Sequence, residues 1–285
     1  MLPIPKIIWY ESTSGGRPTR QNEPWETMDD LDQVKSYVEA YAWGGPTSAL
    51  QLHHLRELSL LIKPGDVVLD LACGPGPLLL ELAAIYPDTT FIGADLSSTM
   101  LQHLRQEAAS RGLKNAVVLQ EDIRTLPSMG DTQVDLVIST SALHHLPDEP
   151  SLRDVFRRTR SLLKRSGGFY MFDFGLLNSP KSRGIFVAEV AKLAPPLTAR
   201  DYDLSLQAAF PIDLVFAAAR EELPRPFRAS ASAFVDFCYF LQTPRRAQPS
   251  AEAQAYIKGI WRKLSATMRA EHLLLRWLRR VATVS

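Results

Sequence analysis

Short apolar runs alternate with amphipathic stretches along the middle of the chain, from residue 67 to residue 174. The first run, Val67–Leu71, is short and continuous, as expected of a parallel strand that is covered on both faces. Similar runs predict strands at 90–95, 116–120, 134–139 and 169–174, and helical patterns predict helices at 77–86, 97–111 and 150–164. This alternation predicts an α/β fold in which a parallel sheet lies between two layers of helices.

The segments on either side of the alternation follow other patterns. Residues 1–25, interrupted by glycine and proline, predict an irregular arm, and helices are expected at 29–42 and 47–62. After residue 174 the pattern predicts helices broken by prolines over 175–224, strand-like segments near 226–231 and 233–241, and a long basic helix over 250–282. The expected domains are an N-terminal arm with a cap helix at 1–46, a core at 47–244 with an insertion at 175–224, and a C-terminal helix at 245–285.

Charge is distributed unevenly along the chain. The whole chain has 32 Lys+Arg and 31 Asp+Glu, a net charge of +1. Residues 245–285 hold nine basic and two acidic residues, a balance of +7, which leaves 23 basic and 29 acidic residues, or −6, in the first 244. The basic segment is amphipathic, so packing on its own acidic body, a homodimer contact and an acidic external surface all stay open as its role.

Composition excludes several classes of protein. Two cysteines, Cys73 and Cys238, cannot form a disulfide framework, and the six histidines lack the spacing of a structural zinc site, so we expect no metal. No apolar run approaches the roughly 18 residues of a membrane span, and the N-terminus does not have the pattern of a signal peptide. These features predict a cytoplasmic protein.

Small and acidic residues follow the first predicted strand, at the edge where open parallel sheets bind ligands. Asp70 lies near the end of this strand, and Ala72, Gly74 and Gly76 allow a ligand to approach the backbone before the next helix begins. Cys73 in the same loop is interpreted as a small filler, because no base lies near it in the sequence. A Gly-x-Gly pair alone is a weak signal, and acids at further strand ends strengthen it.

Two more strands end in such acids. Asp95 lies 19 residues after Gly76, where a carboxylate can accept both hydroxyls of a ribose. Asp122 and Ile123 follow the third strand and can hold the amine and the face of an adenine. The set suits an adenosine with a small charged tail. A dinucleotide is disfavoured because Leu79 occupies the place of the third glycine of that fingerprint.

Taken together, these segments resemble the class I S-adenosylmethionine-dependent methyltransferases, most closely the branch of ubiquinone and menaquinone biosynthesis. The resemblance covers about half of the chain and rests on Val67–Pro77, Gly93–Ser97, Glu121–Ile123, Val134–Pro147 and Leu162–Phe169. It implies a doubly wound, Rossmann-like, seven-stranded and mostly parallel sheet, with the insertion at 175–224 as a helical lid. It also implies S-adenosyl-L-methionine as the cofactor and S-adenosyl-L-homocysteine as the product.

The resemblance assigns residues to this cofactor. The loop 70–76 would wrap its methionine end, Asp95 would hold the ribose, and the backbone around Ser139 would lie beneath the sulfonium. Ala72 departs from the family pattern, which has glycine there. The full set of expected cofactor residues is Asp70, Ala72, Cys73, Gly74, Gly76, Asp95, Leu96, Asp122, Ile123 and Ser139.

Three side chains at the same sheet edge are candidate catalytic residues. Methyl transfer by in-line displacement mainly requires alignment, and a general base is needed only when the nucleophile arrives protonated. His144 and His145 follow the fourth strand, and Asp173 lies near the end of the fifth. The alternatives are packing of a short turn for each histidine and pairing with a helix N-terminus or an arginine for Asp173.

Two groups of side chains are expected around the substrate. Arg183 and Tyr202 of the insertion would line the acceptor site, and Tyr37, Tyr41 and Trp43 would close over the cofactor. The alternative for these aromatic residues is an ordinary packed core.

The expected reaction is methyl transfer to an oxygen, nitrogen or carbon nucleophile of a small molecule or a peptide side chain. Two alternatives belong to other classes: a catalytically silent binding partner that keeps the fold, and an RNA methyltransferase that uses the basic tail. The acidic body disfavours nucleic acid as a partner.

Overall fold

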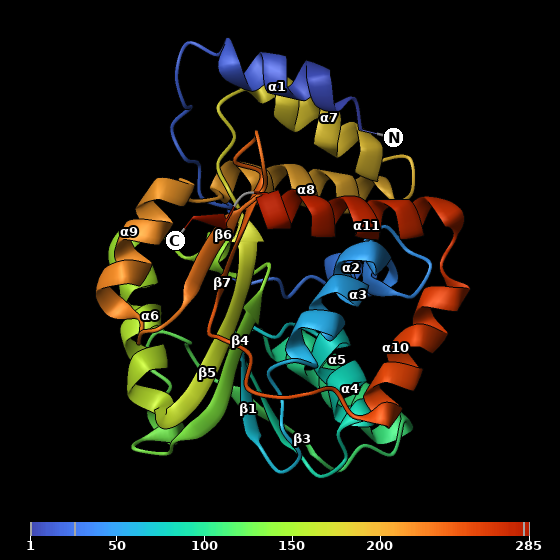
Figure 1. The fold of residues 1–285 in the computed structure, drawn as a ribbon, viewed down its shortest axis with the longest axis vertical. Coiled ribbons are helices and arrows are strands. Elements are labelled where there is room, and N and C mark those ends of the chain that lie inside the picture. Colours follow the sequence, from blue (N-terminus) through green and yellow to red (C-terminus); the bar gives the residue numbers. More distant parts are fainter. Residues whose placement is uncertain (1, 26, 282, 285) are drawn as a thin grey trace.

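The computed structural model describes residues 2–25, 27–281 and 283–284 of the chain (Figure 1). One sheet with the strand order β3-β2-β1-β4-β5-β7-β6-β8 lies at its centre. The strands are β1 (Val67–Leu71), β2 (Thr90–Asp95), β3 (Ala116–Gln120), β4 (Val134–Thr140), β5 (Leu163–Phe174), β6 (Arg228–Ala231), β7 (Cys238–Gln242) and the two-residue β8 (Thr283–Val284).

Five of these strands, β1 to β5, pair in parallel, whereas β7 runs antiparallel to both β5 and β6. The order reverses beside β1, so β1 and β4 diverge at the switch point where parallel sheets bind ligands. The predicted α/β, mostly parallel sheet is confirmed, and β8 extends the seven expected strands by a short pairing with β6.

Two helical layers cover the apolar faces of the sheet (Figure 1). On one face, side chains of α6 (Glu149–Leu162) and α9 (Ile212–Glu222) join β4 and β5 in one buried cluster. The other face is covered by α3 (Ser48–Leu58), α4 (Pro77–Ile85), α5 (Ser98–Ser110) and α10 (Ala251–Lys263). Because α9 packs against α6, the last part of the expected insertion belongs to the helical layer of the core.

A smaller group of elements lies beyond the carboxyl ends of the parallel strands. Figure 1 shows α1 (Ile4–Ser12) stacked on α7 (Pro180–Val190), with α8 (Pro196–Ala208) below them. The cap helix α2 (Leu31–Tyr41) packs against α8, and short 3-10 turns at Pro127–Met129 and Leu143–His145 follow β3 and β4. These elements surround the edge of the sheet where the functional side chains were expected.

The prediction of an irregular N-terminal arm is wrong for residues 4–12, which form α1. Ile7 is fully buried and clusters with Leu177, Phe186 and Leu206 from the insertion. Prolines in the first turn do not prevent this helix, because the missing N–H would be unpaired there in any case. Tertiary burial of one apolar side chain therefore decides the conformation.

The prediction of one long C-terminal helix is also wrong. The chain turns at Leu264, which is buried, so that α10 ends at Lys263 and α11 (Ala266–Val281) begins at Ala266. Residue 282 lies outside the described residues. Both helices pack on the body: the Tyr256 hydroxyl donates a hydrogen bond of 2.5 Å to Glu81 of α4, and α11 lies on α3.

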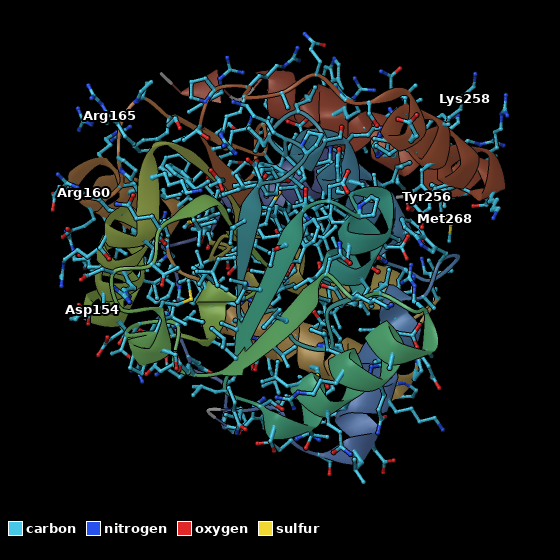
Figure 2. The ribbon with its side chains drawn as sticks, turned by 90° about the horizontal axis from the view of Figure 1, so that it is seen from below. Asp154, Arg160, Arg165, Tyr256, Lys258 and Met268 are labelled. Atoms are coloured by element: carbon cyan, nitrogen blue, oxygen red, sulfur yellow. The ribbon has the colours of Figure 1, made fainter. Side chains whose placement is uncertain are left out.

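The sheet separates the C-terminal helices from α6 and β5. Figure 2 shows Tyr256, Lys258 and Met268 of the C-terminal helices on one side, and Asp154, Arg160 and Arg165 of α6 and β5 on the opposite side. The basic segment thus packs on its own body through apolar side chains such as Ile257, Ile260 and Leu264, which is one of the roles expected for it.

Strand boundaries differ most from prediction at two places. β5 begins at Leu163 rather than residue 169, because it continues through Gly167 and Gly168. The strand expected at 233–241 begins only at Cys238, since Phe234 has a left-handed φ of 68° that breaks an extended chain. Among the described residues, no helix combines the length and the apolar character that crossing a bilayer requires.

Candidate active site

The loop after β1 turns back through left-handed backbone at three positions. Ala72 has φ 52°, Gly74 has φ 57° and Gly76 has φ 71°. A Cβ at Gly76 would lie 2.5 Å from the Leu104 side chain, so only glycine fits there. Ala72, which replaces the family's first glycine, adopts the left-handed backbone despite a cost of roughly 1–2 kcal/mol. The loop therefore keeps its left-handed backbone at residue 72, although alanine stands there in place of the family's glycine.

Asp95 at the end of β2 holds this loop in place. Its Oδ2 accepts the backbone N–H of Gly74 at 2.8 Å, and its Oδ1 accepts that of Ser97 at 2.9 Å. A Cβ at Gly93 would lie 2.7 Å from the Cys73 sulfur, so this glycine lets the loop approach β2.

Asp70, which is buried, and Asp95, which is partly buried, place two acids at the switch point. Burial raises the pKa of Asp70 well above its ordinary value, and the charge of Asp95 raises it further. Burial also raises the pKa of Asp95, against the two backbone hydrogen bonds that lower it. A cationic ligand beside these carboxyls would favour their ionised forms.

Cys73 is buried in the same loop. Burial raises the pKa of its thiol well above the ordinary value, and the charges of Asp70 and Asp95 raise it further. The thiol therefore stays protonated near neutral pH, which agrees with its interpretation as a filler rather than a nucleophile.

The cap helix brings two tyrosines to the same edge. The rings of Tyr37 and Tyr41 stack with 4.4 Å between their centroids. Burial raises the pKa of both phenols, and Tyr37 also senses the charges of Asp95 and Asp70. These two of the three predicted cap residues thus lie near the carboxyls, whereas Trp43 is 36% exposed.

The predicted adenine residues lie after β2 and β3. Asp122 accepts hydrogen bonds from the Arg124 backbone at 2.8 Å and from its guanidinium Nε at 2.7 Å. Burial raises the pKa of Asp122, but its contacts with Arg124 lower it more, to below the ordinary value. Ile123 is buried, and Leu96 is 38% exposed, which is unusual for a leucine at a sheet edge. Asp122 stays a predicted ligand of the amine, although Arg124 engages its carboxylate.

His144 and Asp173 form a buried pair across β4 and β5. The His144 backbone N–H donates to Asp173 Oδ2 at 2.8 Å, and its ring Nδ1 lies 2.7 Å from Oδ1. The backbone N–H of Phe174 also donates to Oδ1, at 2.7 Å. Asp173 thus pairs with the His144 ring and also accepts a backbone N–H from the first turn of the 3-10 helix Leu143–His145, which agrees with the helix N-terminus alternative and not with an arginine.

His145 pairs with Glu23, a residue that sequence reasoning missed. The two groups lie 2.9 Å apart, between His145 Nδ1 and Glu23 Oε2, and the Glu23 side chain is only 3% exposed. Burial raises the pKa of Glu23, but the hydrogen bond and charge of His145 outweigh it and lower the pKa to about 2. Burial lowers the pKa of His145 and the Glu23 contact raises it, with a net upward shift.

Arg20 explains how the N-terminal arm delivers Glu23. Its guanidinium donates to the carbonyl oxygens of His144 at 2.8 Å, Leu146 at 2.5 Å and Pro147 at 2.7 Å. It also donates to Ala208 at 2.7 Å and lies over the Phe210 ring. Arg20 and Glu23 sit in a segment without hydrophobic periodicity, so the only signal in the sequence was two charged residues in an otherwise irregular arm.

Glu23 and the two neighbouring histidines form the one group of possible metal ligands found among the described parts of the chain. Ligand atoms of Glu23, His144 and His145 all lie within 4.8 Å of one another. The sequence led us to expect no metal, because the six histidines lack the spacing of a structural zinc site. This group takes its third residue, Glu23, from a segment far from the histidine pair.

The three remaining predicted site residues, Ser139, Tyr202 and Arg183, lie in β4, α8 and α7. Ser139 is fully buried and its hydroxyl donates to the Leu71 carbonyl at 3.2 Å. Tyr202 packs edge-to-face on Phe174, with ring centroids 5.5 Å apart. Arg183 lies 2.8 Å from Asp203, so its charge is paired within the insertion.

Comparison with known proteins agrees with this geometry. Residues 68–167, which run from β1 into β5, match the family described as methyltransferase domain. The chain carries a class I methyltransferase domain. The domain therefore holds the switch point, the loop after β1 and the histidine pair, whereas Glu23 and Asp173 lie outside the matched residues.

Curated relatives match parts of the chain. A demethylmenaquinone methyltransferase of Symbiobacterium thermophilum is 33% identical over 147 residues, which is 50% of this chain and 53% of the relative. A trans-aconitate 2-methyltransferase of Deinococcus radiodurans is 37% identical over 99 residues, 34% of this chain and 35% of the relative. The chain thus spans about half or less of the length of these relatives.

A solved structure shows the same fold over a longer stretch. A SAM dependent methyltransferase from Aquifex aeolicus has a TM-score of 0.52 and 18% identity. The superposition covers 75% of this chain and 97% of that one. The fold of the methyltransferase domain therefore continues beyond residues 68–167.

Proposed function

We propose that the chain transfers the methyl group of S-adenosylmethionine to a nucleophile of a small molecule or a peptide side chain. The observation that carries the proposal is the buried Asp70 and the partly buried Asp95 beside a left-handed glycine loop at the switch point of a methyltransferase domain. A sulfonium is a cation, and its charge would offset the cost of ionising these carboxyls.

Each end of the cofactor has a candidate environment. Loop 70–76 offers its backbone to the methionine end, and Asp95 lies where the ribose hydroxyls are expected. The exposed Leu96 and the buried Ile123 supply apolar surface for the adenine. The stacked Tyr37 and Tyr41 would cover the sulfonium and exclude water from it.

His144 is the proposed general base. Asp173 is a positioning residue, because an ionised carboxylate only accepts hydrogen bonds and so holds the proton of His144 on Nδ1. The Nε2 atom then presents a lone pair that can take a proton from an acceptor hydroxyl or amine as the new bond to the methyl carbon forms. The methyl group leaves with its bond to sulfur broken, so S-adenosylhomocysteine is the second product.

The acceptor would enter between the 3-10 turn Leu143–His145, called here the histidine turn, and the helices α7 and α8. Tyr202 stands beside Phe174 at the end of β5 and remains the proposed contact of the insertion. Arg183 is proposed to act on the acceptor only if its pairing with Asp203 opens.

Titration calorimetry with S-adenosylmethionine and its demethylated product tests the cofactor assignment. We expect Asp70→Asn to weaken binding, because the amide keeps the shape but removes the negative charge. Asp88→Asn in an exposed turn is the matched control. The proposal fails if the wild-type protein binds neither compound, and a silent binding module is favoured if binding occurs without turnover on any acceptor.

Transfer of a labelled methyl group tests the catalytic assignment. We expect His144→Asn to lower kcat by roughly 10²–10⁴-fold while leaving cofactor affinity unchanged. An unchanged kcat would show that His144 only packs the short turn, the alternative that the sequence left open.

A homodimer through the C-terminal helix is a separate proposal. Leu273 and Trp277, one helical turn apart on α11, are 52% and 55% exposed, although α11 also packs on α3. Light scattering should then give the mass of a dimer for the wild type and of a monomer for the double variant with serine at both positions. A wild-type mass of 31.8 kDa would reject the contact.

A further inference from the structure

The contact between His144 and Glu23 is unusual for a buried pair of polar groups. His144 Nε2 lies 3.9 Å from Glu23 Oε1, and the two side chains are each 3% exposed. This distance is too long for a hydrogen bond. Nε2 is buried and has no hydrogen-bond partner among the described residues.

The tautomer of His144 makes this contact unfavourable as it stands. Because Asp173 accepts a hydrogen bond from the Nδ1–H group, Nε2 carries a lone pair, and this atom faces a carboxylate oxygen that also only accepts hydrogen bonds. Two acceptors that face each other in a buried site need a proton or a cation between them.

A third ligand atom completes a set around the same point. His145 Nδ1 lies 2.9 Å from the other Glu23 oxygen, and the three ligand atoms fall within 4.8 Å of one another. We propose that Glu23, His144 and His145 bind one divalent transition-metal ion. This inference goes beyond the proposed methyl transfer and does not depend on the cofactor.

The donor set selects the kind of ion. Two imidazole nitrogens and one carboxylate oxygen form the three-ligand set of open zinc sites, with a fourth position left for another group. Imidazole favours zinc and its first-row neighbours, whereas magnesium and calcium prefer sites made of oxygen ligands.

The groups behind these ligands support the same assignment. A metal-bound histidine commonly donates its other ring N–H to a carboxylate, as His144 does to Asp173. Glu23 Oε1 accepts the Ser205 hydroxyl at 2.8 Å, which fixes the orientation of the carboxylate. Arg20 is the nearby cation, and its guanidinium is directed to the carbonyl oxygens of the histidine turn.

The site has a consequence for catalysis. The proposed proton acceptor and the proposed metal ligand are the same atom, Nε2 of His144. A bound ion and proton acceptance therefore exclude each other, and Zn²⁺ should inhibit methyl transfer reversibly, with activity restored by a chelator.

Titration of the chelator-treated full-length protein with Zn²⁺, without cofactor or acceptor, tests the site. We expect one ion per chain, with no comparable binding in Glu23→Gln or His145→Asn. Asp173→Asn should weaken binding by roughly 10–100-fold, since it removes a group that orients a ligand. His103→Asn on α5 is the control and should bind as the wild type does.

Co²⁺ provides a second measurement through the visible absorption that depends on its ligands. The spectrum should change when Glu23 is replaced and stay the same in the His103 control. Circular dichroism separates loss of a ligand from loss of the fold, and His145→Asn tests the site independently of the arm. The proposal is overturned if the wild type binds no ion, or if both ligand variants bind it as tightly as the wild type.

Discussion

Asp95 and Gly74 are joined by a hydrogen bond of 2.8 Å, through which the end of β2 fixes the backbone of the loop after β1. The Asp95 carboxylate therefore supports the loop and, in the proposed complex, also faces the ribose. These two tasks can be separated by substitution.

Asp95→Ala should weaken S-adenosylhomocysteine binding by about 10–100-fold, because a hydrogen bond to a charged group contributes roughly 1.5–3 kcal/mol. Asp95→Asn should lose less, since its amide oxygen can still accept the Gly74 N–H. Calorimetric titration of the two variants measures the difference. Equal affinity in Asp95→Ala and wild type would show that the residue supports the loop only.

Gly76→Ala should destabilise the fold by roughly 1–3 kcal/mol, because it combines a left-handed φ with a Cβ that lies 2.5 Å from Leu104. Gly65→Ala is the matched control, with φ 82° and no atom within 4 Å of the added carbon. Denaturant unfolding of both variants compares strain alone with strain plus a clash. Identical losses would argue against the close approach of Leu104.

Arg20→Met should destabilise the protein by about 2–4 kcal/mol, since it keeps much of the packing on Phe210 and removes a charged donor from four carbonyl oxygens. Chemical denaturation measures the loss. Arg200→Met on α8, where the arginine is exposed, should change stability by less than about 0.5 kcal/mol. A loss in Arg20→Met no larger than in this control would contradict the anchoring role of Arg20.

His272 of α11 predicts a pH dependence of stability. The residue is fully buried, and burial lowers its pKa from 6.5 to about 4, against the hydrogen-bond contact with the Ala49 carbonyl. Between pH 6.5 and 4 the unfolded chain binds the proton more readily, so stability is fully present above pH 6.5 and falls as the pH drops towards 4. The loss approaches about 3 kcal/mol.

Unfolding measured across this pH range checks the expectation. His272→Gln should flatten the dependence between pH 6.5 and 4, whereas His103→Gln should leave it unchanged. A slope that survives in His272→Gln would assign the protons to other groups.

The central fold was predictable because its signals are local. Each parallel strand holds an apolar run such as the one in Val67–Leu71, and the strand-end acids Asp70 and Asp95 lie within the last two residues of their strands. Asp70 and Asp95 therefore come together as soon as the strand order is known. The pairing of His144 with Asp173 follows from the same reasoning, since β4 and β5 are neighbours.

The missed features depend on contacts between distant segments. α1 forms because Ile7 is buried by the insertion, and the C-terminal segment bends because Leu264 enters the core. Glu23 reaches His145 only because Arg20 anchors the arm to the histidine turn. No pattern within residues 13–25 indicates that Arg20 and Glu23 contact the turn after β4, so propensity and periodicity could not have predicted these contacts.

The anchoring of the arm also sets the order in which the protein can be completed during synthesis. Arg20 is synthesised before its partner, because the carbonyl oxygen of His144 that it binds lies 124 residues later in the chain. The arm therefore cannot bind at this site until β4 and the turn after it have been synthesised, and its contact with Ala208 forms later still. Arg20 thus reaches its native contacts only after segments that lie 124 and 188 residues later in the chain have been made.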